Sequence, residues 1–490
     1  MNLFITKPFT SSPHADGGDG GLKRVLTARH LVLLGVGATI GAGIFVLTGQ
    51  AAATHAGPAI TLSFVLAGVA TALAALCYAE FAAMLPVAGS AYSYSYATLG
   101  ESVAWFIGWN LVLEYLLGVA TVAVGWSAYF NSLMQSIGNF VGADIALPTA
   151  LASAPFDMVE GRLVATGAIL NLPAMAIIAV MAALCYRGIS RSALVNSIIV
   201  VIKVAVILLF VAFSLQFVDF ANWQPYIPAQ EGPGRFGWDG IVRGASIVFF
   251  AFLGFDAVST AAQEARNPQR DMPIGILGSL VACTLLYIVF AGVLTGIVPY
   301  TQLGTARPVA TALEAFPVLH WLKSLVEVGA VAGLSSVILV LLMAQTRIFY
   351  AMSQDGLIGR MFGRVHERHR TPYLSTILVG VVGCALAGLL PIGVLGDLVA
   401  LGTLLGFATV CAGVLVLRRT RPDLPRPFRV PMAPVVCVLG AAICMWLFMR
   451  VFNDNWHWMT AWVIVGFLIY FGYGYRNSTL RQGQRAGSKT

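Results

Sequence analysis

The chain has 490 residues, of which 58% are hydrophobic and only 10% are charged. Soluble domains carry about 25% charged residues, so this composition excludes a water-soluble protein of this size and indicates a surface that faces lipid. The net charge is +8, but the basic residues lie in short breaks between apolar runs. They form no recognisable nucleic-acid motif, which argues against a nucleic-acid partner.

Residues 1–30 form a polar, glycine-rich stretch without an apolar core of signal-peptide length, so we expect a cytoplasmic tail rather than a cleaved signal. Residues 476–490 form a second polar tail. Between them lie apolar runs of about 20 residues, the length of helix that crosses the hydrocarbon core of a membrane. We predict an all-α membrane protein with twelve transmembrane helices at 31–54, 59–85, 102–131, 167–186, 194–217, 240–262, 272–298, 323–350, 374–391, 394–417, 433–452 and 457–475.

Lysine and arginine gather in alternate loops, and such a bias orients a membrane protein because cytoplasmic loops retain positive charge. With twelve spans, most of the 29 lysines and arginines lie on the side of the two tails. The outer ends of the spans hold Arg162, Arg235, Arg243, Arg307, Lys323 and Arg450. We therefore predict a multi-pass protein of the cell inner (plasma) membrane with both termini in the cytoplasm.

The first predicted span is unusually rich in glycine between Gly35 and Phe45. Glycine weakens a helix, so we expect this span to be broken near Gly41. One alternative is close packing, because Gly37 and Gly41 form a GxxxG step that lets another helix approach. A dinucleotide-binding loop is excluded by the spacing and by the lack of a preceding strand.

In the sixth predicted span, Gly254 and Asp256 interrupt a strongly apolar run that begins at Ser246. Spans one and six each begin a half of five spans, and interrupted helices at corresponding positions of two halves indicate a transporter site. Unwinding exposes main-chain N–H groups, which bind a carboxylate, and carbonyl groups, which accept hydrogen bonds from an ammonium. Two breaks that face each other would hold a zwitterion such as an amino acid.

Three ionisable residues lie well inside predicted spans: Glu114, Lys203 and Asp256. A charge at this depth costs at least about 2.5–3.5 kcal/mol, so each needs a partner, water or a changed protonation state. Burial favours the neutral form of Lys203, and we expect it either to load and release a proton or to tether carbonyls of a neighbouring helix. For Asp256 we expect a role in the substrate site or in ion coupling, a cap on the second half-helix, or an ion pair with a distant cation. Glu114 acts directly or packs in its protonated form, and Glu80 caps or gates the inner end of span two.

The cysteines lie in or at the ends of apolar runs without metal-binding spacing, so we interpret them as packing residues. His366 and His369 lie in a basic segment that we interpret as a solvated helix rather than a metal pair. No histidine or carboxylate cluster has catalytic spacing. We therefore expect no metal, no cofactor and no enzymatic activity. The cysteines are Cys77, Cys185, Cys283, Cys384, Cys411, Cys437 and Cys444.

Four stretches carry a family resemblance, namely Gly37–Phe45, Tyr78–Phe81 with Pro86–Tyr92, Phe250–Asp256 with Glu264–Pro268, and Gln345–Arg347 with Ala351–Gly356. Together they resemble the amino acid–polyamine–organocation (APC) superfamily, in particular bacterial permeases similar to cationic amino acid transporters. This resemblance covers almost the whole chain. It implies a five-plus-five inverted repeat with broken helices 1 and 6, plus two peripheral helices. The implied parts are a tail at 1–30, repeats at 31–217 and 218–417, helices 11 and 12 at 418–475, and a tail at 476–490.

The resemblance also implies which residues form a substrate site from the main chain of the two breaks. Backbone amides of the first break would bind the α-carboxylate, at Ile40, Gly41, Ala42 and Gly43. Backbone carbonyls of the second break would bind the α-ammonium, at Phe250, Ala251 and Leu253. Ala42 replaces a threonine of many bacterial relatives, which removes a hydroxyl but keeps the backbone N–H.

Lys203 matches a lysine on span five that, in similar proteins, substitutes for a bound sodium and links proton state to closure. We assign coupling to Lys203, Asp256 and Glu114. Ser335 and Ser336 match a pair that ligates sodium in sodium-coupled relatives, and they form the fallback ion site.

Leu334 on span eight is placed against the substrate side chain, where leucine leaves little room and no polarity for a guanidinium. We therefore predict proton-coupled symport of neutral, small aliphatic amino acids by alternating access. The alternatives are transport or exchange of cationic amino acids, sodium-coupled uptake, and a sensor that binds amino acids without moving them. A channel is disfavoured because the sequence has no repeated filter loop.

Overall fold

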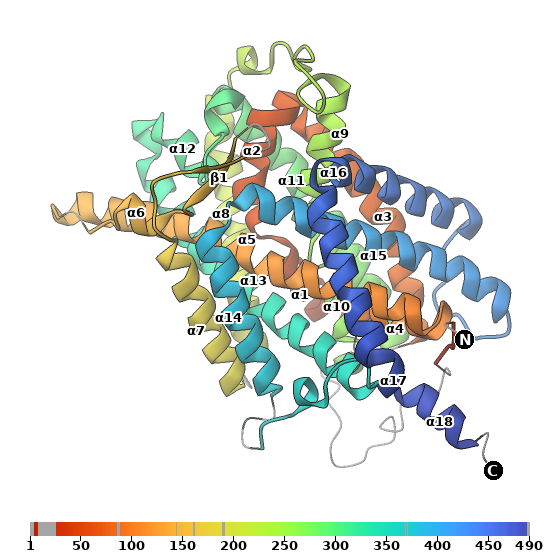
Figure 1. Cartoon of the computed structure of the whole chain (residues 1–490). Helices are drawn as coiled ribbons and strands as arrows, with labels where there is room; N and C mark the ends of the chain where they lie inside the picture. Colours follow the sequence, from red (N-terminus) through yellow and green to blue (C-terminus); the bar gives the residue numbers. More distant parts are fainter. Residues whose placement is uncertain are drawn as a thin grey trace.

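A computed structural model describes residues 4–7, 26–85, 89–143, 145–159, 162–188, 192–367, 369 and 371–487. Most of the N-terminal tail, including Lys23 and Arg24, therefore lies outside the described residues, as do 86–88 of one resemblance stretch. The described chain is mostly helical, and its helices pack into one bundle (Figure 1).

The helices of the first half are α1 (Ala28–Thr39), η1 (Gly43–Leu47), α2 (Thr48–Ala51), η2 (Ala52–Ala56), η3 (Gly57–Ala59), α3 (Ile60–Met84), α4 (Ser90–Thr98), α5 (Glu101–Val141), α6 (Thr149–Ala152), α7 (Leu172–Arg187), α8 (Ser192–Ser214), η4 (Leu215–Phe217) and η5 (Phe220–Trp223). Those of the second half begin with α9 (Gly237–Val248), η6 (Phe249–Phe252), α10 (Ala257–Thr260), η7 (Ala262–Glu264), α11 (Pro268–Ile297), η8 (Tyr300–Leu303), α12 (Pro308–Glu314), η9 (Pro317–Leu319) and α13 (His320–Gln354). The remainder are η10 (Arg360–Gly363), α14 (Tyr373–Leu389), α15 (Ile392–Thr420), α16 (Ala433–Ile469), η11 (Tyr470–Gly474), α17 (Tyr475–Asn477) and α18 (Thr479–Gly487).

Among the described residues, eight helical stretches are long and apolar enough to cross a membrane. They are Gly43–Met84, Glu101–Val141, Ile198–Phe217, Gly237–Thr260, Pro268–Ile297, Pro317–Gln354, Ile392–Thr420 and Ala433–Gly483. Two shorter apolar helices, α7 and α14, fall below that length. Three of the long stretches contain interruptions: Gly57 has φ +60° and Gly254 has φ +103°, and Asn455 has non-helical angles inside α16. The twelve-span count and the inverted repeat stay predictions.

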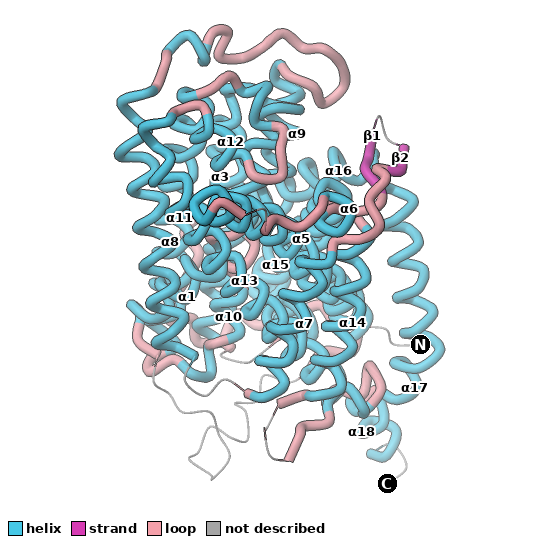
Figure 2. Tube along the Cα trace, turned by 90° about the vertical axis from the view of Figure 1, so that its left-hand side faces the viewer, coloured by secondary structure: helices cyan, strands magenta, loops and turns pink. Residues whose placement is uncertain are grey.

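The connection between α5 and α7 differs from the expectation of helices alone. It contains an antiparallel hairpin of β1 (Phe156–Val159) and β2 (Arg162–Ala165), which lies at the periphery of the bundle (Figure 2). The preceding helix α5 is also longer than the predicted span 102–131. Its 41 residues extend about 60 Å at 1.5 Å per residue, about twice the thickness of a hydrocarbon core, so its end projects beyond the membrane.

The packing brings α5 against α13, α15 and α14, while α11 packs against α1 and α3. At the end of the bundle where the termini lie, Lys7 Nζ is 2.6 Å from Asp355 Oδ1, and Thr479 N donates to Asp355 O. Figure 1 shows the first and last described segments near each other at this end. Which side of the membrane this end faces stays a prediction.

Candidate functional site

The first helix breaks where the glycine-rich run predicts it. Helix α1 ends at Thr39, Ile40 leaves helical geometry with φ −74° and ψ 98°, and the chain resumes as the π-helix η1 at Gly43. Ile40, Gly41 and Ala42 are buried. The main-chain N–H groups of Gly41 and Ala42 therefore lie between two helical segments, at the N-terminal end of the second.

The second break lies between α9 and α10. Helix α9 ends at Val248, the chain tightens into the 3₁₀-helix η6, and Leu253 then adopts an extended geometry with ψ 134°. Gly254 follows with φ +103°, a conformation that glycine adopts readily and other residues avoid. The unwound stretch ends at Asp256, which precedes α10 but makes no capping hydrogen bond to it.

These two breaks meet directly. A Cβ atom added to Gly43 would lie 2.2 Å from Ala251 Cα, and one added to Gly254 would lie 2.7 Å from Ala38 O. Because such contacts are far below van der Waals distance, only glycine allows the two main chains to approach this closely. The residues predicted for the carboxylate and for the ammonium are thus brought together in one buried place.

Tyr287 on α11 links the two breaks. Its hydroxyl lies 2.9 Å from Thr39 O in the first break and 3.0 Å from Ala251 O in the second. The side chain is fully buried. The sequence analysis did not single out Tyr287, because a tyrosine in an apolar run carries no local sign of its two distant partners.

Lys203 on α8 reaches the first break. Its fully buried ammonium donates to Gly37 O and, at 2.9 Å, to Ile40 O. Both carbonyls lie at the end of α1, where a helix has no internal donors for them. Lys203 packs closely on α13, since a Cβ at Gly333 would lie 3.2 Å from its Cδ. These contacts are those of the tether alternative.

Asp256, at the end of the second break, and Glu114 on α5 are both buried. Tyr115 donates a hydrogen bond to Asp256 Oδ2. Asp256 Oδ1 and Glu114 Oε1 are buried and have no hydrogen-bond partner among the described residues. A buried carboxylate oxygen without a donor is costly, so both acids are candidates for a role beyond packing.

Helix α13 supplies one wall of the site through a residue that the sequence analysis missed. A Cβ at Gly41 would lie 3.4 Å from Val337 Cγ1, so Val337 packs on the first break. Leu334 is fully buried one turn earlier, and residues three apart share a helix face. The structure therefore places Leu334 on the face of α13 that contains Val337.

The hydroxyl groups of the fallback sodium pair are already hydrogen-bonded. Ser335 Oγ donates to Val331 O at 2.7 Å and accepts from Trp126 Nε1 at 2.8 Å. Ser336 Oγ donates to Gly333 O at 2.7 Å. No group of three or more His, Cys, Asp or Glu side chains that could hold a metal ion occurs in the described part of the chain.

The other sequence candidates lie away from the breaks. Glu80 on α3 accepts a hydrogen bond from Arg418 Nε at 3.1 Å and one from Val430 N at 2.8 Å, so it joins α3 to the end of α15 and the loop that follows. The His366 and His369 rings lie 4.8 Å apart in the connection between η10 and α14, which is not the helix that the sequence analysis expected. All seven cysteines are free thiols.

Comparison with known proteins agrees with this architecture. A family model described as amino acid permease matches residues 26–469. The chain is 44% identical to the methylthioribose transporter of Bacillus subtilis, over 98% of this chain and 100% of that protein. It is also 44% identical to the branched-chain amino acid permease BcaP of the same organism, over 98% and 99%. It is 37% identical to the vacuolar cationic amino acid transporter 4 of Arabidopsis thaliana, over 86% and 68%. The chain therefore belongs to the amino acid permease family of the APC superfamily.

Proposed function

We propose that this permease is a secondary active transporter, not an enzyme, that carries neutral aliphatic amino acids by alternating access. The observation that carries the proposal is the direct contact of the two helix breaks, with Gly43 against Ala251 and Gly254 against Ala38. Two main chains without regular helical bonding, facing each other in a buried place, present both N–H and carbonyl groups to one small ligand.

A zwitterion fits the opposite polarities of these groups. In the proposed complex, the α-carboxylate accepts hydrogen bonds from the N–H groups of Gly41, Ala42 and Gly43, aided by the positive dipole end of the helix that begins there. The α-ammonium donates to the carbonyls of Phe250, Ala251 and Leu253. Neither end of the substrate then needs a fully charged side chain, which would be costly at this depth.

The side chain of the substrate would lie against α13. Leu334 and Val337 are buried and apolar, and they offer no acceptor for a guanidinium or an ammonium. An unpaired charge there would cost several kcal/mol, so we propose neutral aliphatic substrates, with branched chains included. A relative named as a branched-chain amino acid permease, identical at 44% of positions, supports this choice over cationic amino acids.

Proton coupling is proposed to act through Lys203. Its ammonium already donates to Gly37 O and Ile40 O. A neutral amine is a weaker donor than an ammonium, so loss of the proton would weaken both hydrogen bonds and loosen the end of α1 at the first break. A coupling sodium ion would need the hydroxyls of Ser335 and Ser336 as ligands. Both hydroxyls already donate to main-chain carbonyls. We therefore favour the proton as the coupling ion, with Asp256 and Glu114 as further proton carriers.

A second candidate substrate is methylthioribose, because a relative named as its transporter is also 44% identical over its full length. Methylthioribose has neither a carboxylate nor an ammonium, so it would not use the paired polarities of the two breaks. Competition separates the two candidates: excess unlabelled methylthioribose should leave leucine uptake unchanged if the site is built for zwitterions.

Uptake into proteoliposomes tests the proposed function. Vesicles with an imposed inward proton gradient should accumulate radiolabelled leucine or alanine, and replacement of sodium by choline should not reduce this uptake. Arginine should be taken up poorly. Uptake that needs sodium, or that prefers arginine, would overturn the coupling or the substrate proposal respectively, and binding without any uptake would indicate a sensor.

We further propose that the protein lies in the plasma membrane with both termini in the cytoplasm, and that residues 31–217 and 218–417 form the two repeats. The excess of basic residues on the side of the termini supports this orientation. Labelling of single cysteines introduced at the two ends of the bundle, in whole cells and in inverted vesicles, tests it.

A further inference from the structure

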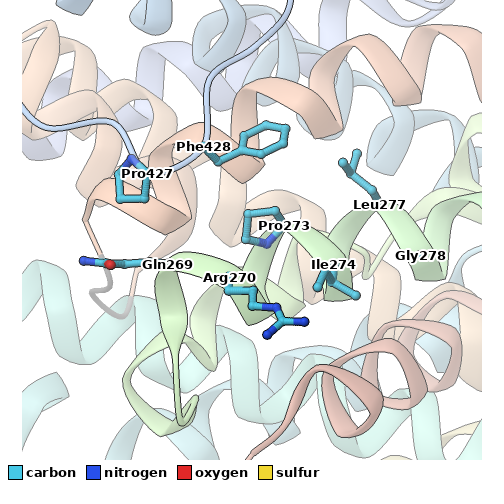
Figure 3. A pocket seen from close by; sticks show the side chains of 8 residues that line it. All are labelled: Gln269, Arg270, Pro273, Ile274, Leu277, Gly278, Pro427 and Phe428. Carbon is cyan, nitrogen blue, oxygen red and sulfur yellow. The ribbon is translucent and has the colours of Figure 1, made fainter.

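A groove of about 530 Å³ lies outside the candidate transport site, between the first turns of α11 and the loop that connects α15 to α16. In Figure 3 the start of α11 forms its floor, and Pro427 and Phe428 lie on its opposite side. The lining residues are Gln269, Arg270, Pro273, Ile274, Leu277, Gly278, Pro427 and Phe428.

The apolar part of this groove continues into a face of α11 that is open to lipid. Ile274, Val281, Leu285 and Val289 are 44–61% exposed and recur at helical spacing, so they form one stripe along α11. In a membrane protein, exposed aliphatic side chains of this kind contact acyl chains. The groove is therefore the end of a lipid-facing surface rather than an isolated hollow.

The other end of the groove is basic. Gln269 and Arg270 lie in the first turn of α11 and are exposed, and no ion pair of Arg270 occurs among the described residues. The neighbouring acid, Asp271, instead accepts a hydrogen bond from Asn267 N. Arg429, directly after Phe428, is also exposed.

Nearby Arg426 is not available to a ligand in the same way. Its guanidinium donates to Pro422 O at 2.9 Å and to Arg421 O at 2.8 Å, so it holds the loop that contains Phe428 in place. The groove thus has a structured apolar wall and a separate arginine, Arg270, which forms no ion pair with any other residue in the described part of the chain.

We propose that this groove binds one anionic phospholipid from the leaflet that meets this end of the bundle. The headgroup phosphate would accept hydrogen bonds from Arg270 and Gln269, since guanidinium groups suit phosphate oxygens. The first part of an acyl chain would lie along Ile274 and Leu277, beneath Phe428. A free phosphate ion would use only the basic end and leave the apolar wall uncovered.

A ligand in this groove would lie next to α1 and α11, two helices close to the first break. Helix α11 packs on α1 just before its break, since a Cβ at Gly275 would lie 2.6 Å from Leu31 Cβ, and one at Gly35 would lie 2.4 Å from Ser279 Oγ. The opposite wall belongs to the loop that Glu80 fixes to α3 through Val430. A bound lipid would therefore join α1 and α11 to the α15–α16 loop.

The test uses the purified full-length protein, delipidated in neutral detergent and titrated with phosphatidylglycerol or with phosphatidylcholine of the same acyl chains. Melting temperature is followed by intrinsic fluorescence, and bound lipid is counted by native mass spectrometry. The variants are Arg270→Ala, which removes the headgroup contact, and Ile274→Trp, which fills the groove without changing its charge. The matched control is Arg364→Ala. Arg364 is an exposed arginine after η10, at the end of the bundle where Arg347 of α13 pairs with Glu264.

We expect phosphatidylglycerol, but not phosphatidylcholine, to raise the melting temperature of the parent protein and of the Arg364→Ala control. Arg270→Ala should raise the half-saturating lipid concentration about fivefold, since one basic residue contributes about 1 kcal/mol at an anionic surface. Ile274→Trp should abolish the effect. Equal stabilisation by phosphatidylcholine or by millimolar sodium phosphate would overturn the proposal, as would equal losses in the Arg270→Ala and Arg364→Ala variants.

Discussion

Adding a single methyl group at Gly43 tests the contact between the two helix breaks. In Gly43→Ala the new Cβ would lie 2.2 Å from Ala251 Cα, whereas ordinary contact begins at 3.4 Å. The two main chains must therefore separate by about 1.2 Å, the difference between these distances. Forced overpacking of this kind costs about 1–3 kcal/mol, which corresponds to a loss of substrate affinity of roughly 5- to 150-fold if it falls on the bound state.

The assay for this variant is equilibrium binding of radiolabelled leucine to purified protein, followed by uptake into proteoliposomes. Gly406→Ala is the matched control, because it makes the same substitution inside α15, where a Cβ would have no neighbour within 4 Å. The control should bind and transport as the parent does, and both variants should remain folded by gel filtration. Parent-like affinity and uptake by a folded Gly43→Ala variant would refute the reasoning.

Three further perturbations follow from the same geometry. Lys203→Ala should abolish accumulation driven by a proton gradient while leaving part of the leucine binding intact, and accumulation at the parent level would exclude this lysine from coupling. Leu334→Ser should improve uptake of arginine relative to leucine, and an unchanged ratio would separate this residue from specificity. Partial burial raises the pKa of the Glu314 carboxyl, but hydrogen bonds from Lys323 and Arg307 lower it more, so its pKa lies below the usual value. The stability that this carboxylate adds is thus present at neutral pH and lost as pH falls through the lowered pKa. Glu314→Gln should therefore reduce the free energy of unfolding by less than about 1 kcal/mol at pH 7 and should leave it unchanged well below about pH 4. A loss of stability that does not depend on pH would contradict these ion pairs of Glu314.

The sequence sufficed for features that depend on local chemistry. The density of glycine predicted the first break near Gly41, and Gly254 with Asp256 predicted the second. Such residues weaken a helix locally, so their positions in the sequence indicate where it breaks. Apolar runs of membrane length predicted the positions of the long helices. Lys203 could be singled out because a charge in an apolar run is rare enough to require a function or a partner.

Contacts between distant parts of the chain were beyond such reasoning. Tyr287 lies 248 positions from Thr39, and nothing near it in the sequence shows that its hydroxyl meets both breaks. Val337 is one of many valines in apolar helices, and only packing places it on Gly41. The β1–β2 hairpin was missed because strands of only four residues carry a weak pattern. The extension of α5 beyond residue 131 was missed because the polar residues there are also compatible with a loop.

The central claim is that main-chain groups of the two breaks hold both charged ends of an amino acid. Binding of leucine should therefore be compared with binding of isoamylamine, which lacks the carboxylate, and of 4-methylpentanoate, which lacks the ammonium. Each lost group removes charge-assisted hydrogen bonds worth about 1.5–3 kcal/mol apiece, so with two or more bonds per group we predict affinities at least about a hundredfold weaker for both analogues. If either analogue binds within a few-fold of leucine, the corresponding break does not hold that end of the substrate.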